Sequence, residues 1–201
     1  MSTWAIIPVK PFLTAKSRLA GALSPDERAA LSRDFLARAL DVLGEVPEVA
    51  HRLVVSRDPA ALTLARAHGA HTITESGAPD LNRALQRATQ AARASRAEAV
   101  LVLPTDLPWL AASDVRAMLA DAPDGPSAVI APDRHESGTN ALWMRPPGLL
   151  PYAFGPGSFM RHLALAAEAG IHARICRLPG LGLDVDVPED LALYRAGQLA
   201  E

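Results

Sequence analysis

Short apolar runs alternate along the chain with longer stretches in which apolar residues recur at helical spacing. The runs are rich in β-branched residues and show little polar alternation, which is typical of central strands covered on both faces. They predict strands at 4–9, 51–57, 70–75, 98–104 and 127–133, with later candidates at 140–145 and 172–178. The stretches between them predict helices at 25–43, 59–68, 80–96, 113–121, 158–169 and 188–197.

Residues at the predicted helix ends agree with this division. Ser24 is suited to cap the first long helix and Pro25 to occupy its first turn, while Gly69 is suited to end the second. Regular strand–helix alternation predicts an α/β fold with a mostly parallel sheet and right-handed crossovers. The sequence contains no internal repeat or linker, so we expect one domain, 1–201. The stretch 134–158 is the least regular and could form an inserted substrate-binding lobe.

Composition and charge narrow the functional classes. Hydrophobic residues make up 49% of the chain, charged residues 21%, and the net charge is −2. Such a chain has no overall field to attract nucleic acid or an anionic membrane. Cys176 is the single cysteine, which excludes an internal disulfide and fits a reducing compartment. With no signal-peptide pattern and no apolar stretch of about 20 residues, we expect a cytoplasmic protein that binds neither nucleic acid nor membrane.

A group of basic residues follows the first predicted strand. Lys10, Lys16 and Arg18 lie in PVKPFLTAKSRL, and ligands of open α/β sheets bind beyond the carboxyl ends of the strands. Ammonium and guanidinium groups form charge-assisted hydrogen bonds with phosphate. This loop therefore predicts an anion site, with an ordinary solvated basic loop as the alternative. It contains neither a Walker A pattern nor GxGxxG, which disfavours a P-loop NTPase and a standard dinucleotide fold.

Acidic residues occupy two further loops. Asp106 follows a strand in LVLPTDLP, where its carboxylate could bind Mg²⁺ or merely cap a turn. In LDVDVPEDL, Asp184 and Asp186 alternate with apolar residues, so an extended segment points both carboxylates to one side. Adjacent carboxylates repel each other unless a cation compensates them. This pair therefore predicts a metal site, with a solvated edge strand as the alternative.

Small residues before a predicted helix offer a second anion site. FGPGSFMRH places Gly155, Gly157 and Ser158 at a helix start, where free backbone amides can bind phosphate, although a plain helix cap explains them equally well. His162 follows one turn later, but nothing in the pattern marks it as a base. Cationic, acidic and amide-rich loops together suit phosphoryl or nucleotidyl transfer, which depends mainly on positioning and charge neutralisation.

Five motifs, in order, resemble one known family over residues 6 to about 193. IPVKPFLTAKSRL, LVLPTDLP, PDRHESGTNAL, FGPGSF and LDVDVPEDL are similar to segments of the CofC/FbiD-type guanylyltransferases of coenzyme F-420 biosynthesis. The resemblance implies a Rossmann-like, GT-A-like nucleotidyltransferase fold with a mostly parallel mixed sheet. It also implies transfer of GMP from GTP to phosphoenolpyruvate or 2-phospho-L-lactate, release of pyrophosphate, and passage of the product to the next transferase of the pathway.

The resemblance also assigns roles to residues. It implies that the acceptor phosphate contacts Thr139, Gly155 and Ser158, and that Mg²⁺ is held by Asp106, Asp184 and Asp186. It assigns the triphosphate to the segment Lys16 to Arg18, which with Lys10 forms the predicted anion site. Catalytic roles are expected for Lys16, Arg18 and Asp106. Asn82, in LNRAL, is expected to contact guanosine.

Three questions stay open at the level of sequence. Phosphoenolpyruvate is the preferred acceptor, but no residue separates it from 2-phospholactate or 3-phosphoglycerate. The alternatives for function are a nucleotidyltransferase of the same fold that uses CTP or UTP, and a nucleotide-binding regulatory module without catalysis. The apolar stretch NALWMRPPGLL is either a homodimer contact or a buried strand followed by a loop.

Overall fold

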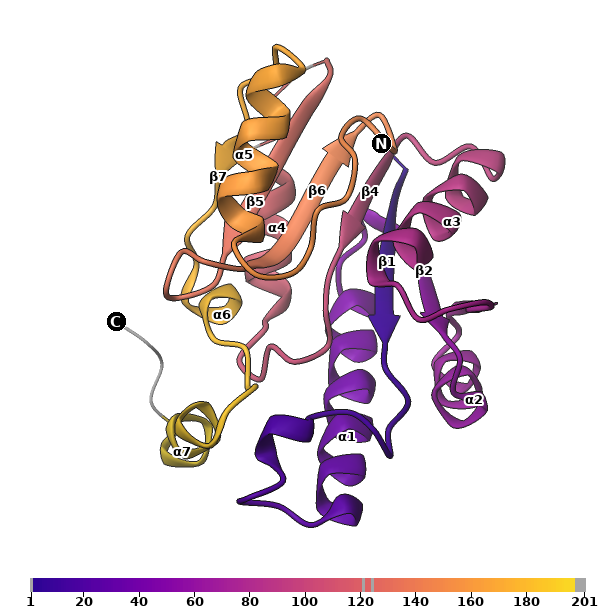
Figure 1. Ribbon diagram of the computed structural model, residues 1–201. Helices are drawn as coiled ribbons and strands as arrows, with labels where there is room; N and C mark the ends of the chain where they lie inside the picture. Colours follow the sequence, from indigo (N-terminus) through magenta and orange to yellow (C-terminus); the bar gives the residue numbers. More distant parts are fainter. Residues whose placement is uncertain (1, 121, 124, 198–201) are drawn as a thin grey trace.

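The computed structural model describes residues 2–120, 122–123 and 125–197 (Figure 1). Its strands are β1 (Thr3–Val9), β2 (Val49–Ser56), β3 (His71–Thr74), β4 (Ala99–Val102), β5 (Ser127–Pro132), β6 (Thr139–Arg145) and β7 (Arg174–Ile175). Its helices are the short 3-10 helix η1 (Ser17–Leu19), α1 (Pro25–Gly44), α2 (Pro59–Ala67), α3 (Leu81–Ala94), α4 (Ala112–Ala120), α5 (Ser158–Glu168), α6 (Pro179–Gly182) and α7 (Pro188–Ala196).

All these strands form one sheet in the order β3-β2-β1-β4-β6-β5-β7. β1 pairs in parallel with β2 and β4, β2 with β3, and β5 with β7. β6 runs antiparallel to both of its neighbours, β4 and β5. The carboxyl ends of all the other strands therefore lie at one edge of the sheet. The predicted mostly parallel mixed sheet flanked by helices is confirmed.

Helices cover both faces of the sheet (Figure 1). On β1, Ala5 and Ile7 point into a core shared with α1, α2 and α4, whereas Trp4 and Ile6 point into a core shared with α3 and Phe159 of α5. This alternation places successive side chains on opposite faces, each of which buries apolar area. A smaller apolar cluster packs α7 against α1 and the loop after β1, through residues that include Leu19, Phe35 and Leu191.

The predicted helix ends agree with the local geometry. Ser24 caps α1: its hydroxyl accepts from the Glu27 backbone N–H at 3.3 Å, and its own N–H donates to the Glu27 carboxylate at 2.7 Å. This reciprocal pair satisfies two backbone donors that the helix leaves free. Gly69 follows α2 at φ 74°, a left-handed conformation that glycine adopts without steric cost.

Some predicted boundaries were wrong. Of the strand expected at 172–178, only Arg174–Ile175 pairs with β5, and η1 and α6 were not predicted. The helix expected at 113–121 begins at Ala112, and residue 121 lies outside the described residues. Within 134–158, the stretch considered as a lobe, residues 139–145 form β6 inside the sheet.

The apolar stretch NALWMRPPGLL resolves in favour of the buried strand. Residues 140–144 are all buried between β4 and β5, so this part of the stretch offers no surface for a dimer contact. Among the described residues, no helix combines the length and the hydrophobicity needed to cross a bilayer.

Candidate active site

The loop after β1 is held at the carboxyl edge of the sheet. The Phe12 backbone N–H donates to the Asp58 carboxylate at 2.8 Å, and the other Asp58 oxygen caps α2 at the Ala60 N–H. Lys16 precedes η1 with φ 53° and ψ 37°. A left-handed conformation is costly for a residue with a β-carbon, and such strain is found where a side chain must be aimed. Here it accompanies a Lys16 ammonium that is directed at two carboxylates.

Lys16 joins two of the predicted acidic positions. Its ammonium donates to the Asp106 carboxylate at 2.8 Å and to the Asp186 carboxylate at 3.1 Å, and its side chain is only 8% exposed. Burial by itself would lower the pKa of Lys16, but the two carboxylates hold it above its usual value. Burial would likewise raise the pKa of Asp106, yet the Lys16 ammonium holds it below its usual value. Both groups therefore carry charge.

Asp184 completes the acidic group. The Val185 N–H donates to the Asp106 carbonyl at 3.1 Å, which joins the 183–187 segment to the loop after β4. Burial, followed by the charges of Asp106 and Asp186, raises the pKa of Asp184 to about 6. Among the described residues, the Asn140 amide is its one side-chain hydrogen-bond donor, at 3.4 Å. Lys16 therefore leaves negative charge uncompensated at Asp184.

Residues outside the prediction hold the acidic segment in place. The Asp190 carboxylate accepts from the backbone N–H groups of Asp186 and Val187, both at 2.9 Å, and pairs with Arg134 at 2.6 Å. Asn140 is buried and donates to the Leu181 carbonyl at 2.9 Å. The sequence pattern did not single out Asp190 as a site residue. The signal that could have identified it is its place in the first turn of α7, four residues after Asp186.

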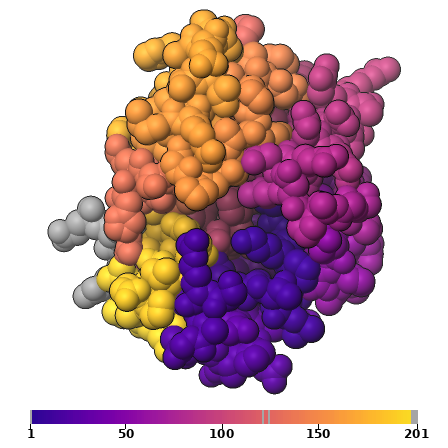
Figure 2. All heavy atoms as spheres, viewed as in Figure 1, coloured from indigo at the N-terminus to yellow at the C-terminus, as the bar shows by residue number. Residues whose placement is uncertain are grey.

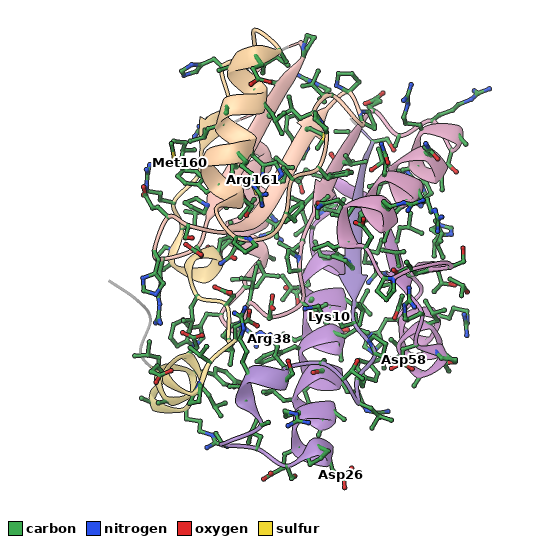
Figure 3. All side chains as sticks on the ribbon, viewed as in Figure 1. Lys10, Asp26, Arg38, Asp58, Met160 and Arg161 are labelled. Carbon is green, nitrogen blue, oxygen red and sulfur yellow. The ribbon has the colours of Figure 1, made fainter. Side chains whose placement is uncertain are left out.

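The other two predicted cations are more exposed. The Arg18 guanidinium is 3.9 Å from Asp186, and its side chain is 73% exposed. Lys10, at the end of β1 (Figure 3), is exposed and adds only a through-space contribution to the pKa of Asp106. Of the three cations, Lys16 therefore forms close ion pairs within the acidic group, whereas the side chains of Lys10 and Arg18 face solvent.

The predicted acceptor residues lie around one loop, 151–157. The Thr139 hydroxyl is 3.0 Å from His162 Nδ1, and His162 Nε2 accepts from the Ala153 N–H at 3.1 Å. Because Nε2 accepts, Nδ1 carries the proton and donates to Thr139. Thr139 and Ser158 are buried, whereas Gly155 is exposed. Burial, with a smaller contribution from Arg161, lowers the pKa of His162 to about 4. His162 is thus a neutral structural residue.

Asn82 braces the same loop. Its amide nitrogen donates to the Phe154 carbonyl at 3.2 Å, and its amide oxygen accepts from the Phe154 N–H at 2.8 Å. The structure thus brings Asn82 to the predicted acceptor loop, and the expected contact with guanosine stays a prediction. We infer that Asn82 positions residues 153–155.

A hollow lies on this face of the molecule. Figure 2 shows it between the loop after β1, α5 and α3, on the face that carries the carboxyl edge of the sheet. Within the described residues, no group of three or more His, Cys, Asp or Glu side chains is arranged to hold a metal ion by itself. Mg²⁺ usually takes one or two carboxylates and completes its shell with water and substrate phosphates, so the set of Asp106, Asp184 and Asp186 stays a prediction. The excess negative charge at Asp184 fits such a cation.

Comparison with known proteins decides the family. The family model described as "Guanylyl transferase CofC like" matches residues 3–194. The chain belongs to this family. A phosphoenolpyruvate guanylyltransferase from Rubrobacter xylanophilus is 46% identical, with 98% of this chain and 95% of that protein covered. A 2-phospho-L-lactate guanylyltransferase from Methanothermobacter thermautotrophicus is 38% identical, with 95% and 83% covered.

Solved structures support the fold of the CofC-like chain. A nucleotidyl transferase from Methanothermobacter superposes with a TM-score of 0.67 at 16% identity, covering 98% of this chain and 97% of the other. A protein from Desulfovibrio desulfuricans G20, assigned as a nucleotide-diphospho-sugar transferase, gives 0.80 at 20% identity and covers 100% and 90%. The predicted nucleotidyltransferase fold is therefore confirmed.

Proposed function

We propose that this chain transfers GMP from GTP to phosphoenolpyruvate with release of pyrophosphate, in the cytoplasm and as a step of coenzyme F-420 biosynthesis. The names of the relatives support the reaction class. Phosphoenolpyruvate is preferred over 2-phospho-L-lactate because the Rubrobacter relative and a 41% identical protein from Sphaerobacter thermophilus are both named for it. The product would pass to the next transferase of that pathway.

One observation carries the proposal: Lys16 bonds Asp106 and Asp186 at the carboxyl edge, beside Asp184, whose pKa is raised to about 6 by burial and by those two carboxylates. Asp106, Asp184 and Asp186 would hold Mg²⁺ together with substrate phosphates. A bound Mg²⁺ would offset charge on the α-phosphate and the acceptor phosphate. Lys10 and Arg18, free to face solvent, would bind the triphosphate, and Lys16 would fix the carboxylates.

The chemistry requires little from the protein beyond placement. A phosphate oxygen of the acceptor attacks the α-phosphorus of GTP, the bond to the bridging oxygen breaks, and pyrophosphate leaves with the bonding electrons. The attacking oxygen is already ionised at neutral pH, so no general base is needed. Accordingly, the buried His162 has both ring nitrogens occupied and its pKa lowered to about 4. Thr139, Gly155 and Ser158 would contact the acceptor phosphate.

Pyrophosphate release tests the reaction. The purified chain is incubated with Mg²⁺, each of GTP, CTP, UTP and ATP, and each of phosphoenolpyruvate, 2-phospho-L-lactate and 3-phosphoglycerate. We expect release with GTP and phosphoenolpyruvate above all other pairs, with the next transferase added to consume an unstable product. Release with CTP or UTP alone would indicate a different nucleotidyltransferase. Nucleotide binding without release from any pair would indicate a regulatory module.

A further inference from the structure

Arg161 lies beside the proposed acceptor site and has not yet been given a role. It belongs to the first turn of α5, three residues after Ser158, and its backbone N–H donates to the Gly157 carbonyl at 3.2 Å. Figure 3 shows its side chain turned toward the hollow, whereas Met160 of the same turn points away from it. The Arg161 guanidinium is therefore directed at the space that substrates would enter.

Arg161 differs in its side-chain contacts from other arginines near the carboxyl edge. Arg134 pairs with Asp190 and Arg57 with Glu75. Within the part of the chain that the structure describes, the guanidinium of Arg161 has neither an ion-pair nor a hydrogen-bond partner. An unpaired cation beside a substrate site is available to an anionic group of a ligand.

Gly155 makes room for this guanidinium. A β-carbon on residue 155 would lie 3.3 Å from Arg161 Nη2, and the backbone there has φ 124°, which side chains rarely adopt. The guanidinium thus packs against the backbone of Gly155, the exposed residue among the three proposed to contact the acceptor phosphate. It lies next to the place where the acceptor phosphate would bind.

The proposed acceptors carry two anionic ends, a phosphate and a carboxylate. The phosphate is assigned to Thr139, Gly155 and Ser158, and Lys16 is occupied by Asp106 and Asp186. We infer, resting on the proposed function, that Arg161 binds the carboxylate of the phosphorylated three-carbon acid and so selects acidic acceptors. A planar guanidinium matches a carboxylate with two parallel hydrogen bonds.

The test combines a substitution with a substrate deletion. Phosphoenolpyruvate is compared with isopropenyl phosphate, in which a methyl group replaces the carboxylate, for the wild type and for Arg161→Gln, Arg161→Lys and Arg93→Gln. Arg93 lies in the last turn of α3, so its variant controls for the loss of one exposed arginine. Pyrophosphate release gives kcat and KM for each acceptor, and competition against phosphoenolpyruvate gives the Kd of isopropenyl phosphate.

With phosphoenolpyruvate, Arg161→Gln should lower kcat/KM roughly 10- to 100-fold, as for the loss of a charged hydrogen-bond pair, and Arg161→Lys should restore part of it. With isopropenyl phosphate, turnover or Kd should stay within about 3-fold of the wild type, because the lost contact was never made. The KM for GTP should stay unchanged.

Equal losses for both acceptors, or no loss for phosphoenolpyruvate, would overturn the carboxylate role while leaving the proposed function standing. A wild type without turnover on any acceptor would overturn the proposed function and this inference with it.

Discussion

Among the site residues, Asp184 is the carboxylate whose ionised form is disfavoured by its surroundings. Burial and the neighbouring Asp106 and Asp186 raise its pKa to about 6, above the ordinary value of 3.8. The folded protein therefore holds this proton more tightly than the unfolded chain, which releases it first, so stability falls as pH rises from about 4 to 6. Above pH 6 the full cost remains. A binding site for a cation accounts for a carboxylate kept in such surroundings.

Asp184→Asn should raise the stability of the protein while it lowers the activity. Without Mg²⁺ at pH 7.5, we expect a gain of about 1–2 kcal/mol in unfolding free energy, after allowance for solvent screening, and a smaller gain at pH 5. Turnover should fall at least about 100-fold. Urea unfolding at both pH values and pyrophosphate release measure these effects, with the exposed Asp34→Asn as the control. Lower stability at pH 7.5, or full activity, would contradict the assignment.

His162 produces a pH dependence of the opposite sign. Its pKa falls from 6.5 to about 4 on folding, because the ring is buried. The unfolded chain binds the extra proton first, so stability should fall by roughly 3 kcal/mol as pH drops from 6.5 to 4. His162→Gln should flatten that part of the curve of unfolding free energy against pH. The exposed His172→Gln is the control; if it flattened the curve as much, another group would be responsible.

At the scale of elements, α7 is a brace for the acidic segment. Asp190 ties the first turn of the helix to the backbone of Asp186 and Val187 and to Arg134 after β5. The pair spans two loops that are far apart in sequence, and removing one partner of a buried pair leaves an uncompensated charge. The geometry of the proposed metal site thus depends on a side chain that is not itself a proposed ligand.

Asp190→Ala should raise the Mg²⁺ requirement of the reaction more than the KM for GTP. We expect a stability loss of about 3 kcal/mol and a 10- to 100-fold rise in the Mg²⁺ concentration needed for half-maximal activity, on the order found for groups that orient metal ligands. The KM for GTP at saturating Mg²⁺ should change little. The neighbouring, exposed Glu189→Ala serves as the control. An unchanged Mg²⁺ requirement would mean that Asp190 stabilises the helix alone.

The elements were largely predictable because their signals are local. Apolar runs marked the strands, and Ser24 and Pro25 marked the start of α1. The strand at 172–178 was overestimated because its apolar residues do pack into the two cores, yet only Arg174–Ile175 pairs with β5. Because ligands of open α/β sheets bind beyond the carboxyl ends of the strands, the sequence also indicated that Lys16, Asp106 and Asp186 lie together. The ammonium between the two carboxylates was not predictable, since it joins residues 90 and 170 positions apart.

The same limit explains the acceptor loop. Composition offered no reason for Asn82 and His162 to bond the backbone of residues 153–154, because those contacts depend on how α3 and α5 pack on the same face of the sheet. The contact of Asn82 with guanosine was expected from the family resemblance and stays a prediction, and His162 was left without a role.

For the whole molecule, the sheet divides the proposed substrates between two regions. β1 and β4 deliver the cationic loop and Asp106, while β6 and α5 deliver Thr139, Gly155 and Ser158 across the same hollow (Figure 2). The acidic segment before α7 lies where these regions meet, through Val185 on one side and Asn140 on the other. This division predicts that damage on the α5 side affects the acceptor and spares GTP.

Gly155→Ala tests that division. A β-carbon at φ 124° is strained and would crowd Arg161 Nη2 at 3.3 Å, so loop and guanidinium must shift. We expect the KM for phosphoenolpyruvate to rise about 10-fold, equivalent to about 1.4 kcal/mol, with the KM for GTP within about 2-fold. Gly170→Ala is the matched control, because Gly170 follows the other end of α5 at φ 69° with nothing within 4 Å of its added β-carbon. Initial rates over a matrix of both substrates measure the two constants. If both KM values rose together, the two substrates would share the α5 side, and the acceptor site would have to be placed elsewhere in the hollow.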